Sequence, residues 1–166
     1  MPTTIGRRLP PQRLINLINP AVRATLRSPL HRAVDGALLI LHVTGRRTGH
    51  RYDIPVGYVD LDGRFVVVTQ HRWRANLRGG ADIEVTHAGH RQPMHAELDD
   101  VPASVADTLR RMIEEIGWKG TQRQTGLTTD TGRVPTVPEL EEAVREYDLA
   151  TVLLTSAQPG EQVVLG

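Results

Sequence analysis

Residues 44–49, Thr-Gly-Arg-Arg-Thr-Gly, combine residue types that bind phosphate. Consecutive backbone N–H groups in a glycine-bounded turn can form an anion-binding concavity. The guanidinium groups of Arg46 and Arg47 and the hydroxyl of Thr48 would add charge-assisted donors. The segment is not a P-loop, because the spacing and the lysine of that motif are both missing. A solvated hairpin tip has the same composition, so this segment, which we call the arginine turn, leaves two interpretations open.

A second candidate lies at residues 73–80, Trp-Arg-Ala-Asn-Leu-Arg-Gly-Gly. If this segment is helical, Trp73 and Asn76 share a face one turn apart, with Leu77 beside them. Trp73 could then stack on a planar ring, and Asn76 could hydrogen-bond its polar edge. The alternative is a core tryptophan that caps one end of a barrel, with Asn76 bonded to the backbone.

Other common chemistries find little support. The chain has no cysteine, which excludes disulfides, thiol nucleophiles and cysteine-bound metals. The histidines at 87, 90 and 95 invite a zinc site, but a glycine turn and strand alternation predict that their rings lie on different faces. No serine lies in a nucleophile elbow. The sequence therefore predicts no metal site and no serine hydrolase.

Composition and charge narrow the function classes. With 166 residues, 39% hydrophobic and 23% charged, the chain is expected to form a single globular domain. Residues 1–96 carry a net charge of +8 and residues 97–166 a net charge of −7, so the first part favours an anionic partner. Only 4% of the residues are aromatic, which argues against a nucleic-acid partner that stacks its bases.

The segment from residue 10 to residue 36 has an apolar helical periodicity, broken by Pro20 and Pro29. It is rich in arginine, so it could pack on the barrel or lie on an anionic membrane surface. The longest apolar run, residues 37–41, is far too short to span a membrane, and no signal-peptide pattern begins the chain. We therefore expect a cytoplasmic protein, with peripheral contact to the inner face of the membrane left open.

The remaining pattern predicts short antiparallel strands with peripheral helices, hence an α+β fold dominated by a small β-barrel. Residues 1–9 are expected to be loose, 71–80 to form a short helix and 117–136 to form a loop. The predicted organisation of the single domain, 1–166, is a basic helical segment (1–36), barrel strands with cofactor loops (37–100), and helices with a final strand (101–166). The expected strands are 37–43, 52–59, 64–70, 82–86, 91–99 and 149–155, and the expected helices are 103–116 and 138–145.

Taken in order, the motifs resemble the deazaflavin-dependent nitroreductase family, within the flavin/deazaflavin oxidoreductases of split β-barrel fold. The resemblance rests on the arginine turn, on Pro-Val-Gly-Tyr-Val at 55–59, on Val-Val-Val-Thr-Gln at 66–70 and on Trp-Arg-Ala-Asn-Leu at 73–77. It covers about residues 38–85 well and extends loosely to the arginine-rich segment before them. It implies the reduced deazaflavin coenzyme F420 as cofactor.

The resemblance also implies a role for each matching residue. The arginine turn would hold the phosphate and acidic tail of the coenzyme, residues 55–57 would lie beside its ring, and residues 69–71 would end the strand whose loop embraces it. Trp73 and Asn76 would close the site. The implied cofactor-binding residues are Arg46, Arg47, Thr48, Gly49, Pro55, Val56, Gly57, Thr69, Gln70, His71, Trp73 and Asn76.

The chain departs from the family pattern in two places. The family has a Lys-Gly-Gly loop before the tryptophan, whereas only His71 and Arg72 stand there, and Gly57 replaces an aromatic residue that borders the substrate in some members. No catalytic residue is assigned. Tyr52 and Tyr58 are candidate proton donors, and strand alternation puts them on one face.

The leading hypothesis is hydride transfer to a small quinone, enone or nitro acceptor, by a monomer or a homodimer. Two alternatives remain: an FMN-binding oxidoreductase of the same fold, and a non-catalytic split barrel that binds a coenzyme, a haem or a lipid-like ligand.

Overall fold

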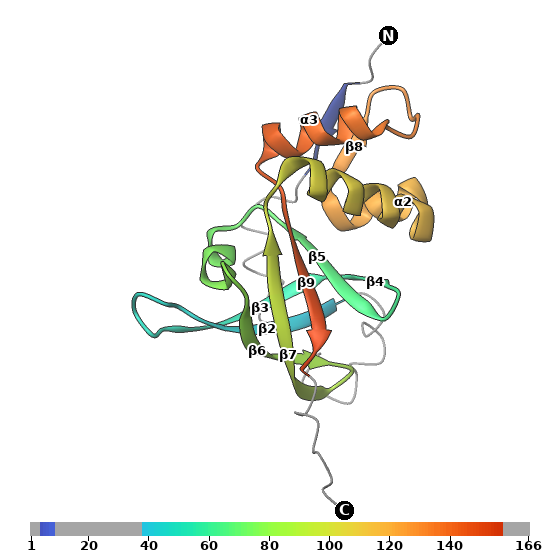
Figure 1. The fold of residues 1–166 in the computed structure, drawn as a ribbon. Coiled ribbons are helices and arrows are strands. Elements are labelled where there is room, and N and C mark those ends of the chain that lie inside the picture. Colours follow the sequence, from blue (N-terminus) through green and yellow to red (C-terminus); the bar gives the residue numbers. More distant parts are fainter. Residues whose placement is uncertain (1–3, 9–37, 158–166) are drawn as a thin grey trace, which may run out of the picture.

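The structure is a computed structural model that describes residues 4–8 and 38–157. A strongly curled sheet fills one part of the molecule, and the helices α2 and α3 lie together at one end of it (Figure 1). The predicted helical segment at 10–36, with its suggested membrane contact, lies outside the described residues.

The curled sheet has seven strands in the order β3-β2-β6-β7-β9-β5-β4, and every neighbouring pair is antiparallel. Across the curl, β3 comes back close to β5, so the sheet is a half-closed barrel. This confirms the predicted α+β, mainly antiparallel, split-barrel class. The strands are β2 (Leu38–Thr44), β3 (Arg51–Gly57), β4 (Val59–Leu61), β5 (Arg64–Thr69), β6 (Ala81–His87), β7 (His90–Asp99) and β9 (Ala150–Ser156).

Alternation along the strands creates two apolar cores. Leu39, Leu41, Val67, Val85 and Leu154 are fully buried inside the curl. The opposite face of β5 and β9 packs against α2 and α3, which contribute Val105, Leu109, Met112, Leu140 and Val144. Because side chains fill the small barrel, a large ligand must bind at its ends or on its outer surface.

Pro55 and Gly57 predict that the strand 52–59 is bent or at a sheet edge, and the structure divides it into two strands, with β3 at one edge of the sheet. β3 ends at Gly57 and β4 begins at Val59, so the chain bends at Tyr58. An Asp-Gly hairpin follows, with positive φ at Asp62 (55°) and Gly63 (80°), and the Gly63 N–H donates to Asp60 Oδ1 at 2.8 Å. Despite the bend, Tyr52 and Tyr58 lie on the same side of the sheet, because Tyr52 is paired with Val43 of the core inside the curl and Tyr58 packs against that core.

The C-terminal third differs most from expectation. Helix α2 runs over Pro102–Thr125. It therefore includes residues 117–125 of the predicted loop, because Gly117 (φ 76°, ψ 169°) kinks the helix without ending it. Gly126 then caps it in the left-handed conformation. Helix α3 (Val137–Tyr147) begins with a capping box between Thr136 and Glu139.

The expectation that residues 1–9 are loose is wrong for β1 (Ile5–Arg7). This strand pairs antiparallel with β8 (Leu127–Thr129) in a separate two-stranded sheet beside α3. Strands of three residues at distant positions leave no periodicity for a local pattern to detect.

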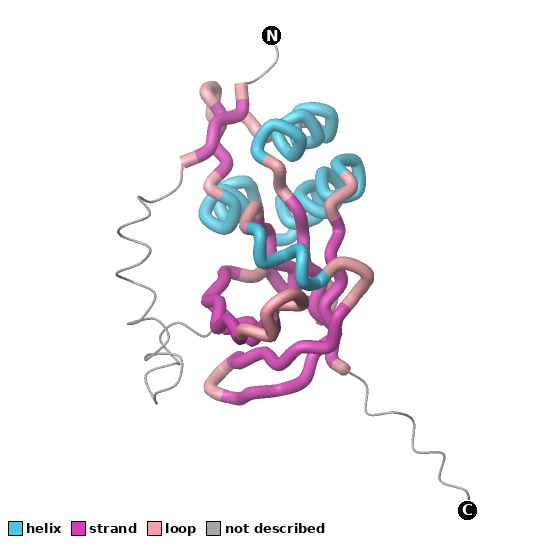
Figure 2. The backbone as a smooth tube through the Cα atoms, turned by 90° about the vertical axis from the view of Figure 1, so that its left-hand side faces the viewer, coloured by secondary structure: helices cyan, strands magenta, loops and turns pink. Residues whose placement is uncertain are grey.

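The predicted short helix is present as η2, a 3₁₀ helix over Arg72–Leu77. In Figure 2, η2 lies between the strands of the barrel and the helices α2 and α3. Leu77 is fully buried, and both Leu77 and Trp73 pack on the core inside the curl. η2 therefore closes this end of the barrel.

Candidate functional site

The arginine turn connects β2 to β3, and the side chains of Arg46, Arg47 and Thr48 are exposed. The Gly45 N–H donates to the His50 carbonyl (2.7 Å), and the Gly49 N–H donates to the Gly45 carbonyl (2.9 Å). Gly49 has a φ of 69°, which favours glycine. The Thr48 hydroxyl accepts from the His50 N–H at 3.2 Å. These bonds fix the turn and leave the guanidinium groups of Arg46 and Arg47 on the surface.

Helix η2 meets the arginine turn directly. The Arg46 backbone N–H donates to Asn76 Oδ1 at 3.0 Å, and Asn76 Nδ2 donates to the Trp73 carbonyl at 3.0 Å. The Arg46 guanidinium also reaches the Gly80 carbonyl, at 3.4 Å. The two segments singled out from the sequence are thus side by side, joined by the Asn76 amide, which holds one backbone N–H that an anion would otherwise use.

A cavity of about 240 Å³ lies between the turn, η2 and β6. Arg46, Arg51 and Asn76 line it, but so do Asp82 and Glu84. Because these carboxylates repel an anion, the outer side of the turn suits a negatively charged tail better than this cavity does.

Trp73 packs on the barrel core rather than standing free in solvent. Its indole Nε1 is buried and has no hydrogen-bond partner among the described residues. An unsatisfied buried donor costs stability, so this nitrogen is a group that a bound ligand could satisfy only if the surrounding packing moved.

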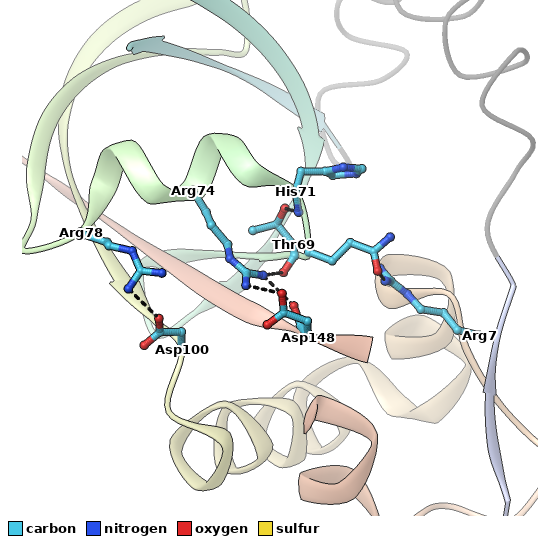
Figure 3. A network of polar contacts seen from close by, with 8 residues as sticks. Arg7, Thr69, His71, Arg74, Arg78, Asp100 and Asp148 are labelled. Atoms are coloured by element: carbon cyan, nitrogen blue, oxygen red, sulfur yellow. Dashed lines mark hydrogen bonds and ion pairs between the residues drawn. The ribbon is translucent and has the colours of Figure 1, made fainter. Parts of the chain in front are cut away.

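The residues at the end of β5 are engaged with the rest of the fold. Thr69 is buried, and its hydroxyl accepts from the His71 N–H at 3.1 Å. Gln70 Oε1 accepts a short hydrogen bond from Arg7 Nη1, while Arg7 Nε donates to the Thr125 carbonyl at 3.0 Å. Burial lowers the pKa of the Arg7 guanidinium, since it removes water from the charged form. His71 is exposed, and its ring points away from Arg74 in Figure 3.

Sequence reasoning did not assign a role to Arg74, which lies between Trp73 and Asn76 and is only 8% exposed. Its Nη1 donates to the carbonyls of Thr69 (3.3 Å) and Asp148 (2.6 Å), and its Nη2 pairs with Asp148 Oδ2 at 2.8 Å (Figure 3). Asp148 is the C-cap of α3. The guanidinium therefore clamps η2 to the junction of α3 and β9.

A second buried polar group was also missed. His42 lies on β2, where its Nδ1 contacts Asp53 Oδ1 at 2.7 Å and its Nε2 contacts Thr86 Oγ1 at 2.8 Å. This network joins β3, β2 and β6, and His42 also lines the 240 Å³ cavity. No group of three or more metal-ligating side chains that could hold an ion occurs in the parts of the chain that the structure describes.

The other predicted contacts, Pro55, Val56 and Gly57, lie at the far end of β3 from the arginine turn. Six residue steps separate Arg51 from Gly57, which is roughly 20 Å along a strand. Gly57 borders a cavity of about 750 Å³ between the bend at Tyr58 and the kinked part of α2. The predicted site residues thus form two groups, one at each end of β3.

A family model described as F420H(2)-dependent quinone reductase matches residues 18–137. The chain belongs to this family. It is accordingly an oxidoreductase whose cofactor is coenzyme F420, and the FMN and non-catalytic alternatives are set aside. The two exposed guanidinium groups and the Thr48 hydroxyl at the arginine turn are a donor set that fits a polyanionic coenzyme.

No curated protein matches the chain. Among solved structures, one described as a domain-swapped dimer is 13% identical, covers 85% of this chain and 98% of its own, and has a TM-score of 0.46. In the described ranges, no helix has both the length and the apolar character needed to cross a membrane.

Proposed function

We propose that this F420-dependent reductase uses a quinone as its acceptor and binds the coenzyme along β3. The coenzyme supplies the hydride when bound. Arg46, Arg47 and Thr48 hold its anionic tail at one end of β3, and residues 55–57 lie beside its ring at the other. The observation that carries this proposal is the hydrogen bond from the Arg46 N–H to Asn76, which unites the two motifs of the family pattern.

Three other predicted residues hold the segments that carry the site in place. Asn76 fixes the backbone of the arginine turn, Trp73 packs η2 onto the barrel, and Thr69 accepts from the backbone at the start of the following loop. In this proposal the protein positions the coenzyme, neutralises its charge and keeps water from the reacting atoms.

A titration with F420H2 tests the coenzyme site. Replacing both Arg46 and Arg47 with alanine removes two charge-assisted contacts, each worth roughly 1.5–3 kcal/mol, so we expect the Kd to rise by at least about 100-fold. The affinity of the wild type is expected to fall with added salt. Arg110→Ala is the matched control, because this exposed arginine pairs with Asp107 and Glu114 within α2.

The acceptor class is tested with the same preparations. We expect turnover with a soluble quinone and F420H2, and much slower turnover with nitroaromatic and enone acceptors. An unchanged Kd in the double alanine variant would remove the arginine turn from the coenzyme site. Turnover of nitroaromatics or enones above that of quinones would contradict the assignment of the acceptor.

A further inference from the structure

A cavity of about 320 Å³ lies between the curled sheet and the segment of α2 before its kink. Its volume is at the lower end of the range of small-molecule sites. In the described part of the chain, it shares no lining residue with the cavities beside the arginine turn and beside Gly57. This space, which we call the α2 cavity, is therefore separate from the proposed coenzyme site.

Strand alternation gives the α2 cavity an apolar floor. Val67 and Val152 belong to the core inside the curl, so their neighbours Val66 and Leu153 point to the α2 side of the sheet. Val66 and Leu153 are directly paired across β5 and β9, and Leu61 of β4 lies on the same side. This floor suits a ligand with an apolar body.

A buried hydroxyl group lies in the same floor. Thr151 is two residues before Leu153 on β9, so it also faces α2, and it is only 4% exposed. Its hydroxyl has no hydrogen-bond partner among the described residues. A hydroxyl that opens into a cavity can bond to a ligand in place of water. Thr151 therefore offers a hydrogen bond to the middle of a bound molecule.

One side of the α2 cavity is cationic. Arg64, at the start of β5, makes no ion pair with a described residue. Arg111 reaches from α2 to the turn between β4 and β5, where its Nη2 pairs with Asp62 Oδ2 at 3.2 Å. Because Asp62 neutralises part of the charge of Arg111, Arg64 is the cation that is left to bind a ligand carboxylate.

The opposite side of the cavity is acidic, because Glu97 and Asp99 lie there on β7. The Asp99 carboxylate is used by the start of α2, since it accepts from the Val101 N–H (3.1 Å) and from the Ser104 hydroxyl. The Glu97 carboxylate contacts His95 Nε2 at 3.7 Å, which is too long for a hydrogen bond. Glu97 is therefore the carboxylate that can accept from a ligand ammonium group.

The separation of the two charged sides limits the size of the ligand. β7, β9 and β5 are consecutive in the sheet, so two strand spacings, roughly 10 Å, separate the strand of Glu97 from the strand of Arg64. Both side chains are long and shorten the gap. Two residues of extended peptide span at most about 7 Å, which matches the remaining distance. A free α-amino acid carries both charges on one carbon and is too short.

We propose that the α2 cavity binds a small zwitterion with an apolar body, of the chemical class of apolar dipeptides. Arg64 binds its carboxylate, Glu97 binds its ammonium group, and Thr151 hydrogen-bonds the peptide group between them. The apolar side chains of the ligand lie on the floor of the cavity. A simple anion is repelled by Glu97 and a simple amine by Arg64. This site does not depend on the proposed function.

Isothermal titration calorimetry of the full chain with the dipeptide leucyl-leucine tests the site. N-acetyl-leucyl-leucine lacks the ammonium group and leucyl-leucine amide lacks the carboxylate, so these two peptides are matched controls. We expect saturable binding of leucyl-leucine, with a Kd about 10-fold lower than that of either blocked peptide, because each blocked peptide loses one charge-assisted contact.

Two variants assign the ends of the ligand. We expect Arg64→Met to raise the Kd of leucyl-leucine about 10-fold and to leave the Kd of the amide unchanged, because the amide lacks the group that Arg64 binds. Glu97→Gln should likewise weaken leucyl-leucine but not its acetylated form. Arg110→Met is the matched control, since Arg110 pairs with Asp107 and Glu114 within α2 and does not line the cavity.

Thr151→Val tests the floor, because it keeps the shape of the side chain and removes only the hydroxyl. We expect it to raise the Kd of all three peptides by about the same factor, roughly threefold. Circular dichroism melting of each variant verifies that it is folded.

The outcomes decide the proposal. Absence of saturable binding at millimolar leucyl-leucine overturns it, and so does equal affinity for the three peptides. If Arg64→Met weakens leucyl-leucine and its amide equally, Arg64 does not bind the carboxylate and the assignment is wrong. The Kd for F420H2 is expected to stay at its wild-type value in all these variants. Failure of the wild type to bind F420H2 contradicts only the proposed function.

Discussion

The clamp formed by Arg74 is expected to determine both the stability of the barrel end and the position of the coenzyme site. The test is Arg74→Met, which keeps most of the apolar stem and removes the guanidinium. The variant loses donors to the Thr69 and Asp148 carbonyls and the ion pair with the Asp148 carboxylate. Because Asn76 belongs to the same helix, the arginine turn loses part of its support as well.

The magnitude follows from the burial of the two partners. Hydrogen bonds from a charged donor contribute roughly 1.5–3 kcal/mol each, but they are not additive. The side chain of Asp148 is 80% exposed, so water solvates its carboxylate once the arginine is gone. Removing the buried guanidinium also removes its desolvation penalty, which offsets a further part of the lost stability. We expect a net loss of about 2–3 kcal/mol, which lowers the Tm by roughly 4–12 °C in a chain of this size.

Urea unfolding followed by circular dichroism measures this loss, with Arg78→Met as the matched control. Arg78 follows η2 and pairs with Asp100 at 3.3 Å, but both side chains are substantially exposed (Figure 3). Such a pair contributes at most about 1 kcal/mol. Equal midpoints for the two variants would refute the clamp, and so would an Arg74→Met protein that unfolds earlier yet binds F420H2 as tightly as the wild type.

Three further predictions concern the elements around the site. Thr136→Ala removes the capping box of α3 and should cost about 1 kcal/mol in urea unfolding at unchanged m; an unaltered midpoint would show that the cap contributes nothing. Gly117→Asn should destabilise by about 1–3 kcal/mol, whereas Gly126→Asn should cost less, because only the second glycine has left-handed helical angles that asparagine tolerates; the reverse order in thermal melts would contradict this. Gln70→Ala removes the side-chain acceptor of Arg7 and should accelerate amide exchange in β1 and β8 with little change in the barrel; exchange at the wild-type rate would show that other contacts hold β1.

The local sequence was sufficient for the barrel strands. The alternation of apolar residues and the glycine-containing turns predicted the strands, because both the side-chain period and the turn conformation depend on a few adjacent residues. The predicted boundaries of strands and helices were wrong where the backbone bends or kinks. The bend at Tyr58 split one predicted strand, and the kink at Gly117 concealed the last third of α2.

The candidate site was predicted only in part. The residue types of the arginine turn indicated an anionic ligand, and the resemblance to a known family implied that it is a deazaflavin coenzyme. The structure brings this turn and the Trp73–Asn76 segment together through one hydrogen bond. The buried partners were not foreseen. Arg74 and Asp148 are 74 positions apart, and Arg7 and Gln70 are 63 positions apart, so no local spacing connects them.

The sequence by itself therefore determined most strands and turns, since these follow from the chemistry of neighbouring residues, and its resemblance to a known family implied the coenzyme. Only the tertiary structure decided that Tyr58 packs on the core inside the curl and meets His87, while Tyr52 contacts His50 and is 41% exposed. It also decided that a buried guanidinium attaches the site helix to the end of α3. The physical reason is that burial and charge pairing arise from contacts between distant segments, and these contacts exist only after the sheet has curled.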